Sequence, residues 1–180
     1  MHVMLDLETL GTKPGCAIVS IGSCVFNMTG VQEKFYRAID ITKKIANGHL
    51  AMDPGTIVWW MSKSPEARAV FADPERVGTY DAINDFRSWW LDMELKYPSA
   101  GQYLWCHGAT FDAPIIEAVY NAIGHQAPFK FYNVRDTRTL YALADVALDR
   151  TKGTHHNALD DAVVQAEAVI RAYGVLGKTL

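Results

Sequence analysis

The sequence predicts an α/β protein whose five strands form one mixed sheet flanked by helices. Two features of the chain lead to this class. Three segments rich in β-branched residues follow one another before residue 40, as in antiparallel strands with short connections. Beyond residue 50, helical periodicity alternates with two short apolar runs, which is typical of parallel strands joined by crossover helices.

The first half of the predicted sheet is an antiparallel unit. Residues 2–8 (HVMLDLE) form an apolar strand with acids near its end, and residues 17–27 form a second strand rich in valine and isoleucine. A turn at residues 28–30 leads into a third strand over residues 31–39, whose side chains alternate in polarity. This spacing predicts a hairpin between the second and third strands.

The middle of the chain has helical patterns. Capping side chains directly before a proline, at Asp53-Pro54 and Ser64-Pro65, mark two helix starts. Apolar residues that recur on one face predict a longer helix over residues 79–97. These residues are Ile83, Phe86, Trp90 and Leu91.

The C-terminal part alternates between strands and helices. Short apolar runs predict strands over residues 103–106 and 129–134. Helices are predicted over residues 112–123, 137–147 and 157–173, with Gly124 and Gly174 ending the first and the last. The two strands therefore join the antiparallel unit through crossover helices.

Composition favours a single globular domain over residues 1–180. Hydrophobic residues make up 49% and charged residues 21%, which excludes a disordered or coiled-coil protein. A net charge of −3 excludes a basic surface that holds duplex nucleic acid through many phosphates. No secretory leader and no apolar run of membrane-spanning length is present, so we expect a cytoplasmic protein without a membrane partner. Cys16, Cys24 and Cys106 lie in apolar surroundings and are expected to be buried, reduced thiols.

Two carboxylates, Asp6 and Glu8, lie two residues apart near the end of the first predicted strand. Side chains at this spacing point to the same face of a strand. The two carboxylates repel each other there, and a divalent cation between them would remove the repulsion. The alternative is a strand end that reaches solvent, where both acids are hydrated. A third acid, Asp112, follows the strand of residues 103–106 and is either a site residue or a helix cap.

The last predicted helix starts with two adjacent acids, Asp160 and Asp161, and the helix dipole favours acids at this end. At about 100° per residue the two side chains point to different faces. Asp160 shares its helix face with the charged residues Glu167 and Arg171. Asp161 shares its face with small or uncharged residues, namely Ala158, Gln165 and Ala168. We therefore predict that Asp161 is a site residue and Asp160 a surface acid.

Two histidines, His155 and His156, precede this helix, and helix capping does not explain them. A pair of surface residues is one alternative. Half of a zinc site is another, although no further His or Cys lies at the spacing of zinc ligands.

Three motifs resemble those of the DEDDh exonucleases: DLET at residues 6–9, Phe-Asp at 111–112, and H-x-A-x-x-D at 156–161. These are 3′-to-5′ exonucleases of the ribonuclease-H-like fold, and they include ribonuclease T and polymerase proofreading subunits. Residues 56–60 and 64–68 look like the exonuclease A subfamily of tailed phages and its bacterial exoribonuclease relatives. The resemblance spans residues 3 to about 173.

The resemblance implies a catalytic set of five residues: Asp6, Glu8, Asp112 and Asp161 as metal-binding acids, and His156 as general base. The cofactors would be two Mg²⁺ or Mn²⁺ ions, which prefer oxygen ligands. The reaction would release nucleoside 5′-monophosphates from single-stranded 3′ ends of RNA or DNA.

The resemblance also implies contacts with the substrate. The turn at Thr9-Leu10 would meet the terminal nucleotide, with simple packing as the alternative for Leu10. One tryptophan would stack on a base; we favour Trp60 over Trp59, and burial of both is the alternative. The remaining candidates are His107, Phe111, Arg135 and Arg138. Gly108 departs from the family, because many members have Asn there.

Two other functions are alternatives. A single-strand-binding module on the same fold would not need all five catalytic positions, so their presence favours the enzyme. A metallophosphatase acting on small phosphoesters would need the same ions. Members of the resembled family that have this size are often homodimers, so the resemblance also implies a possible homodimer.

Overall fold

The computed structural model describes residues 1–43, 50–98 and 101–180, and its described strands form one mixed sheet in the order β3-β2-β1-β4-β5. The central strand β1 pairs antiparallel with β2 and parallel with β4; β3 is antiparallel to β2, and β5 is parallel to β4. The strands are β1 (His2–Thr9), β2 (Ile18–Asn27), β3 (Gly30–Ala38), β4 (Tyr103–Cys106) and β5 (Val134–Asp136). The predicted fold class and hairpin are confirmed.

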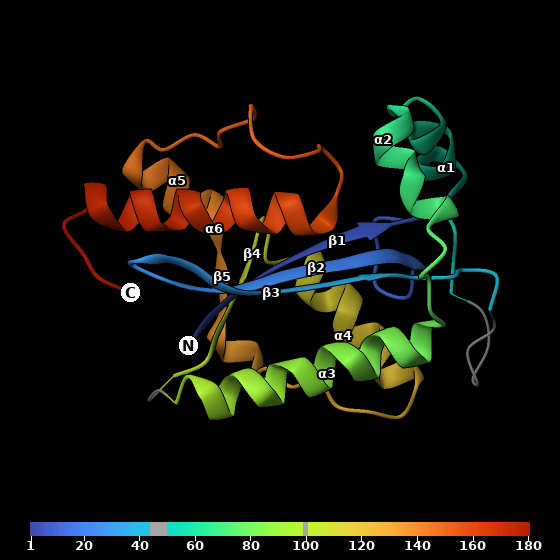
Figure 1. The fold of residues 1–180 in the computed structure, drawn as a ribbon, viewed down its shortest axis with the longest axis horizontal. Helices are drawn as coiled ribbons and strands as arrows, with labels where there is room; N and C mark the ends of the chain where they lie inside the picture. The colour runs from blue at the N-terminus through green and yellow to red at the C-terminus, as the bar shows by residue number, and fades with distance from the viewer. Residues whose placement is uncertain (44–49, 99–100) are drawn as a thin grey trace.

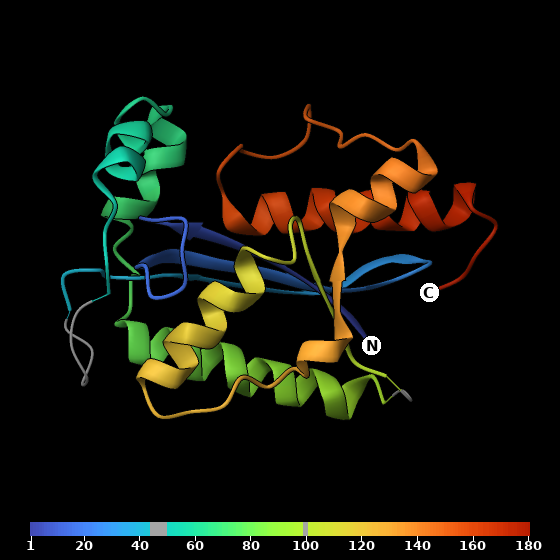
Figure 2. The same cartoon turned by 180° about the vertical axis from the view of Figure 1, so that it is seen from behind.

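Helices cover both faces of the sheet (Figures 1 and 2). Helices α3 (Thr79–Lys96) and α4 (Asp112–Ala122) lie on one face, and α5 (Thr137–Ala144) and α6 (Ala158–Val175) lie on the other. The short helices α1 (Pro54–Met61) and α2 (Pro65–Arg68) stand apart, at the end of the sheet where β1 finishes. No helix among residues 1–43, 50–98 and 101–180 is long and apolar enough to cross a membrane.

The two faces of the sheet are packed differently. On the α3 side, large side chains such as Phe86 and Trp90 fill the core. On the α6 side, alanines of the helix contact the sheet, which lets α6 approach closely. Gly22 of β2 makes the closest approach possible, since a Cβ there would lie 2.0 Å from the backbone of Ala158. The start of α6 is thereby held directly against the centre of the sheet.

The predicted capping residues are confirmed. Asp53 accepts a hydrogen bond from the amide of Thr56, and Ser64 caps α2 in the same way. Asn157 caps α6. The three cysteines are buried and unpaired, as expected.

Three predicted boundaries are wrong. The strand expected over residues 129–134 is a 3₁₀ turn, Phe131–Asn133, followed by β5, because Phe131 and Tyr132 point to solvent and are 79% and 63% exposed. Helix α5 ends at Ala144, since Asp145 adopts a left-handed conformation with φ of 52°. Helix α6 continues through Gly174, and the left-handed glycine after it is Gly177.

Candidate active site

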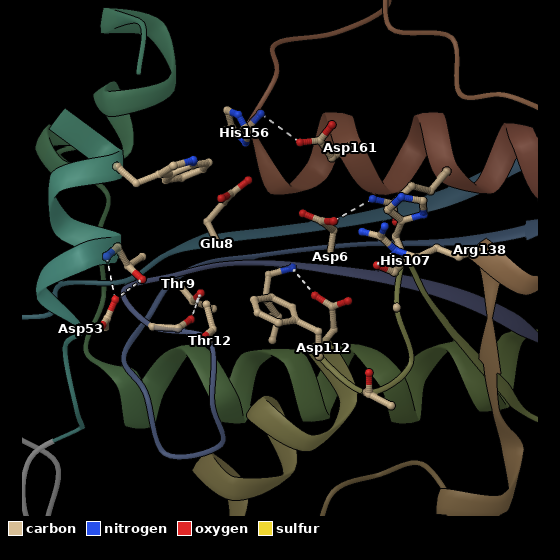
Figure 3. A pocket seen from close by; sticks show the side chains of 18 of the residues that line it. Asp6, Glu8, Thr9, Thr12, Asp53, His107, Asp112, Arg138, His156 and Asp161 are labelled. Atoms are coloured by element: carbon tan, nitrogen blue, oxygen red, sulfur yellow. Dashed lines mark hydrogen bonds between the residues drawn. The ribbon is translucent and has the colours of Figure 1, made fainter. Parts of the chain in front are cut away.

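An open pocket of about 830 Å³ lies at the end of β1. Its lining comes from β1, the start of α1, the loop after β4, and the start of α6. In Figure 3, Asp6, Glu8, His156 and Asp161 point toward a common space between β1 and α6. Segments that are far apart in the sequence therefore meet at one end of the sheet.

The first two acids stand where the central strand loses one of its neighbours. β1 pairs with β4 only from His2 to Leu5, whereas its pairing with β2 continues to Thr9. Asp6 and Glu8 follow this divergence and face the same side, as their spacing predicts. Glu8 is 7% exposed, so it is not the hydrated acid of the alternative interpretation.

The third acid uses the free edge of β1. Asp112 is the first residue of α4, and its Oδ1 accepts a hydrogen bond of 3.1 Å from the amide of Leu7. That amide faces the side on which β4 has already ended. Asp112 does not cap α4, because the capping position belongs to Phe111. The hydrogen bond links α4 to the strand that carries Asp6 and Glu8.

The fourth acid lies in the first turn of α6. Asp161 lines the pocket, and its Oδ2 accepts a hydrogen bond of 2.9 Å from the amide of His156. Asp160 lies outside the pocket lining and accepts from the amide of Thr154 at 2.8 Å. Asp161 therefore faces the pocket and Asp160 does not, as the helix periodicity predicts.

The four carboxylates are partly or fully buried close together and repel one another when they are ionised. Burial raises the pKa of Asp6 well above its ordinary value, and Asp112, Glu8 and Asp161 add to this effect. Burial likewise raises the pKa of Glu8 to about 8 and that of Asp112 to about 7. Positive charge placed among these groups would remove the repulsion.

The donor set fits a hard divalent cation. Glu8, His156 and Asp161 each offer a ligand atom, and these atoms lie within 4.8 Å of one another. Six carboxylates line the pocket, against two guanidinium groups, those of Arg138 and Arg150. Carboxylate oxygens are the ligands that Mg²⁺ and Mn²⁺ prefer.

His156 stands on the loop that leads into α6. Its backbone is left-handed, with φ of 65°, and its ring packs edge-on against Trp59 with the centroids 4.8 Å apart. Burial lowers the pKa of His156, while nearby Asp161 opposes this shift. The ring of His155 points elsewhere, with its Nε2 at 3.0 Å from the carbonyl of Arg150. Only His156 of the pair lines the pocket.

The adjacent tryptophans of α1 have different surroundings. Trp60 is 3% exposed, and its Nε1 donates a hydrogen bond of 2.9 Å to the carbonyl of Thr9. Trp59 is 39% exposed and lines the pocket, with the ammonium of Lys63 at 4.0 Å from its ring centre. The preference for Trp60 as the base-stacking residue is therefore wrong: Trp60 belongs to the core, and Trp59 faces the pocket.

Comparisons with known proteins agree with this geometry. The model of the Rv2179c-like 3′-5′ exoribonuclease domain matches residues 1–172. The chain belongs to this family.

The exodeoxyribonuclease of Enterobacteria phage T4 is 30% identical to this chain over 157 residues, which cover 76% of this chain and 68% of that protein. Two solved structures share the fold. Exonuclease X in complex with 5′ overhanging duplex DNA has a TM-score of 0.59 at 18% identity, over 98% of this chain and 93% of the other. The nuclease domain of 3′hExo, a DEDDh family member bound to rAMP, has a TM-score of 0.61 at 13% identity, over 96% and 91%.

The resemblance to DEDDh exonucleases is thus confirmed, and the protein is a 3′-5′ exonuclease of the ribonuclease-H-like fold that acts on nucleic acid. Enzymes of this family generally use divalent metal ions, which the carboxylate cluster of this exonuclease fits. Family membership favours the enzyme over the non-catalytic binding module.

Four of the remaining substrate candidates line the pocket of the exonuclease, namely Thr9, His107, Phe111 and Arg138. The Thr9 hydroxyl donates to the carbonyl of Gly11, and a ring nitrogen of His107 lies 2.8 Å from the hydroxyl of Thr137. Burial lowers the pKa of His107 to about 4, with Arg138 contributing, so its imidazole is neutral near pH 7.

Two further candidates, Leu10 and Arg135, do not line the pocket. Leu10 is 4% exposed in the core, so packing explains it. Arg135 lies over the ring of Tyr103 at 4.6 Å and lines a different cavity. Neighbouring residues of a strand point to opposite faces, which separates Arg135 from Asp136 at the pocket.

The departure at residue 108 has a local cause. Gly108 has φ of 110°, a conformation that side-chain-bearing residues rarely adopt. This turn carries the amide of Ala109 to Asp136, whose Oδ2 accepts its hydrogen bond at 2.8 Å. The loop after β4 is therefore shaped by the positive φ of Gly108.

Several pocket residues were not predicted. Arg150 and Thr12 lie outside the motifs, so only the fold brings them to the site, and Thr56 lies in a motif without having been singled out as a site residue. Gln165 is different, because it lies four residues after Asp161 on the same face of α6. Because residues four apart on a helix are neighbours on its surface, the position of Asp161 could have been used to predict that Gln165 lies at the site.

Proposed function

We propose that this exonuclease removes single nucleotides from single-stranded 3′ ends of RNA or DNA with two Mg²⁺ or Mn²⁺ ions, and releases nucleoside 5′-monophosphates. One observation carries the proposal. Asp6, Glu8, Asp112 and Asp161 converge in one pocket, and only two guanidinium groups oppose the six carboxylates of its lining. A phosphate would be repelled from this pocket unless bound cations offset the acids.

The four acids would hold the ions; in Figure 3, Asp6 lies beside Glu8 and below Asp161. When bound, the two ions supply an activated water and stabilise the leaving 3′-oxygen of an in-line displacement. The phosphate then remains on the 5′ side of the released nucleotide.

His156 would accept the proton of the attacking water. A ring nitrogen of His156 lies within 4.8 Å of carboxylate oxygens of Glu8 and Asp161, and its backbone amide donates a hydrogen bond to Asp161. The ring packs on Trp59, which is itself exposed to the pocket. A base that stacks on Trp59 would therefore lie beside the proton acceptor.

Both types of nucleic acid are proposed as substrates. The family is that of an exoribonuclease domain, and the phage relative is an exodeoxyribonuclease. Among the described residues, Arg138 and Arg150 are the basic side chains that line the pocket, and Lys63 lies at its edge over Trp59. Few phosphates would therefore be bound, and short single-stranded ends should be preferred to long blunt duplex. A single domain over residues 1–180, a cytoplasmic location and a homodimer stay predictions.

The metal part of the proposal is tested by thermal unfolding with and without Mg²⁺. The ion should raise Tm because it binds the folded site and not the unfolded chain. Asp161→Asn should shrink this shift, and the matched control Asp160→Asn should keep it. Equal effects of the two variants would contradict the assignment.

The substrate part is tested on end-labelled RNA and DNA, single- and double-stranded, with Mg²⁺, Mn²⁺ or EDTA. We expect hydrolysis of the single strands with either metal and none with EDTA. Faster turnover of p-nitrophenyl phosphate than of every oligonucleotide would support the metallophosphatase instead.

A further inference from the structure

Gln165 is buried beside the carboxylate cluster, although neither the motifs nor the family resemblance assigns it a role. It is 4% exposed on α6 and lines the pocket one turn after Asp161. Its Nε2 donates a hydrogen bond of 2.7 Å to Oδ1 of Asp6, which Figure 3 marks with the dashed line at Asp6. The contact joins α6 to the central strand at its first acid.

The partner fixes the orientation of the Gln165 amide. With a cation bound, the Asp6 carboxylate is ionised and only accepts hydrogen bonds, so the atom facing Asp6 is the Gln165 nitrogen, as the hydrogen bond shows, and the oxygen points the other way. That oxygen, Oε1, is buried and has no hydrogen-bond partner within the described residues. An unpaired buried acceptor costs about 1–3 kcal/mol, and such atoms are rare in folded proteins. Gln165 is one of the residues that line the pocket, so a ligand bound there can supply the missing donor.

The position of Gln165 is fixed independently of Asp6. Its backbone carbonyl accepts a hydrogen bond of 2.6 Å from the hydroxyl of Tyr141 on α5. Alanines on either side of it in the sequence pack α6 against the sheet. The backbone that carries the Gln165 side chain is therefore fixed, as it must be for a residue that orients another.

We propose that Gln165 is a positioning residue of the metal site, which orients Asp6 through Nε2 and accepts a hydrogen bond through Oε1 from a water molecule in the shell of the bound cation. With Oδ1 of Asp6 held by the amide, Oδ2 stays available to the cation. This inference rests on the proposed function only in that the carboxylate cluster binds a divalent cation.

The test replaces Gln165 with methionine, which keeps the length of the side chain and removes both hydrogen-bonding groups. We expect Mg²⁺ affinity, measured from the Mg²⁺-dependent rise in Tm and by calorimetry without substrate, to fall about 10–100-fold. The Tm in EDTA should stay close to that of the wild type, because the unpaired oxygen is removed together with the donor. Gln126→Met, an exposed position, is the matched control and should change neither quantity.

Kinetics separate positioning from a structural role. For Gln165→Met, kcat should fall at low Mg²⁺ and recover toward the wild-type value at high Mg²⁺, while KM for a short oligonucleotide stays unchanged. Unchanged Mg²⁺ affinity would overturn the proposal. A drop in Tm of equal size with and without Mg²⁺ would also overturn it, in favour of a purely structural role.

A second variant covers the case in which the methionine variant does not fold. Gln165→Glu places an ionised carboxylate against Asp6, so Tm in EDTA at pH 8 should fall and saturating Mg²⁺ should restore it. An unchanged Tm in EDTA would show that residue 165 does not face Asp6. Mg²⁺ binding that depends on Gln165 in a protein without 3′-end hydrolysis would instead refute the proposed function and leave this inference standing.

Discussion

Glu8→Gln should make the metal-free protein more stable at alkaline pH, although it removes a carboxylate that we propose holds the metal ions. Burial raises the pKa of Glu8 from 4.5 to about 8, and Asp161 and Asp112 add to the shift. The unfolded chain ionises this carboxyl near pH 4.5 and the folded chain only near pH 8, so between these values ionisation favours unfolding.

The size of the effect follows from the pKa shift. One pKa unit corresponds to about 1.4 kcal/mol, so full ionisation of Glu8 costs the folded state at most about 5 kcal/mol. Burial of the neutral amide of the variant costs about 1–3 kcal/mol. We therefore expect Glu8→Gln to raise the free energy of unfolding by about 2–4 kcal/mol at pH 8.5 in EDTA, and to lose this advantage by pH 4.5.

The assay is urea unfolding in EDTA at several pH values between 4.5 and 8.5. Glu117→Gln, at an exposed position of α4, is the matched control and should follow the wild type at every pH. Saturating Mg²⁺ should stabilise the wild type more than Glu8→Gln and so close or reverse the difference. If the variant is no more stable than the wild type at pH 8.5 in EDTA, the claim that ionised Glu8 destabilises the metal-free fold is refuted.

Three further variants test other parts of the site. His156→Ala should slow hydrolysis about 10²–10⁴-fold with nearly unchanged oligonucleotide binding, whereas His155→Ala should change the rate of hydrolysis little. Single-turnover experiments measure the rate, and fluorescence anisotropy measures the binding. A larger loss of rate in His155→Ala than in His156→Ala would contradict the assignment. Trp59→Ala should raise KM with little change in Tm, whereas Trp60→Ala should lower the free energy of unfolding by about 3–5 kcal/mol; similar Tm values for the two would contradict their different burial. Gly108→Asn should lower the free energy of unfolding by about 1–3 kcal/mol in urea because of its positive φ, and an unchanged value would show that the loop relaxes.

Local periodicity predicted the parts of the site that lie within one element. The spacing of Asp6 and Glu8 along a strand placed both on one face, and the helix period separated Asp161 from Asp160. These rules hold because the backbone geometry of a strand or helix fixes the direction of each side chain.

Features that depend on packing between elements were not predicted. Trp59 and Trp60 differ by about 100° around α1, and the sequence does not say which side of that helix docks on the core. Asp112 looked like a helix cap because its partner, the amide of Leu7, becomes available only where β4 ends beside β1. The apolar letters of residues 129–134 suggested a strand, but two of the aromatic residues face solvent.

The most direct test of the account uses one oligonucleotide labelled at its 5′ end and, in parallel, at its 3′ end, with Mg²⁺ and with Asp6→Asn as the control. The account predicts a descending ladder from the 5′ label, only labelled nucleoside 5′-monophosphate from the 3′ label, and no cleavage by a folded Asp6→Asn variant. A 3′-phosphate should block the wild type. Cleavage of a circular single strand, the opposite labelling pattern, or more than about a tenth of the wild-type rate in Asp6→Asn would contradict it.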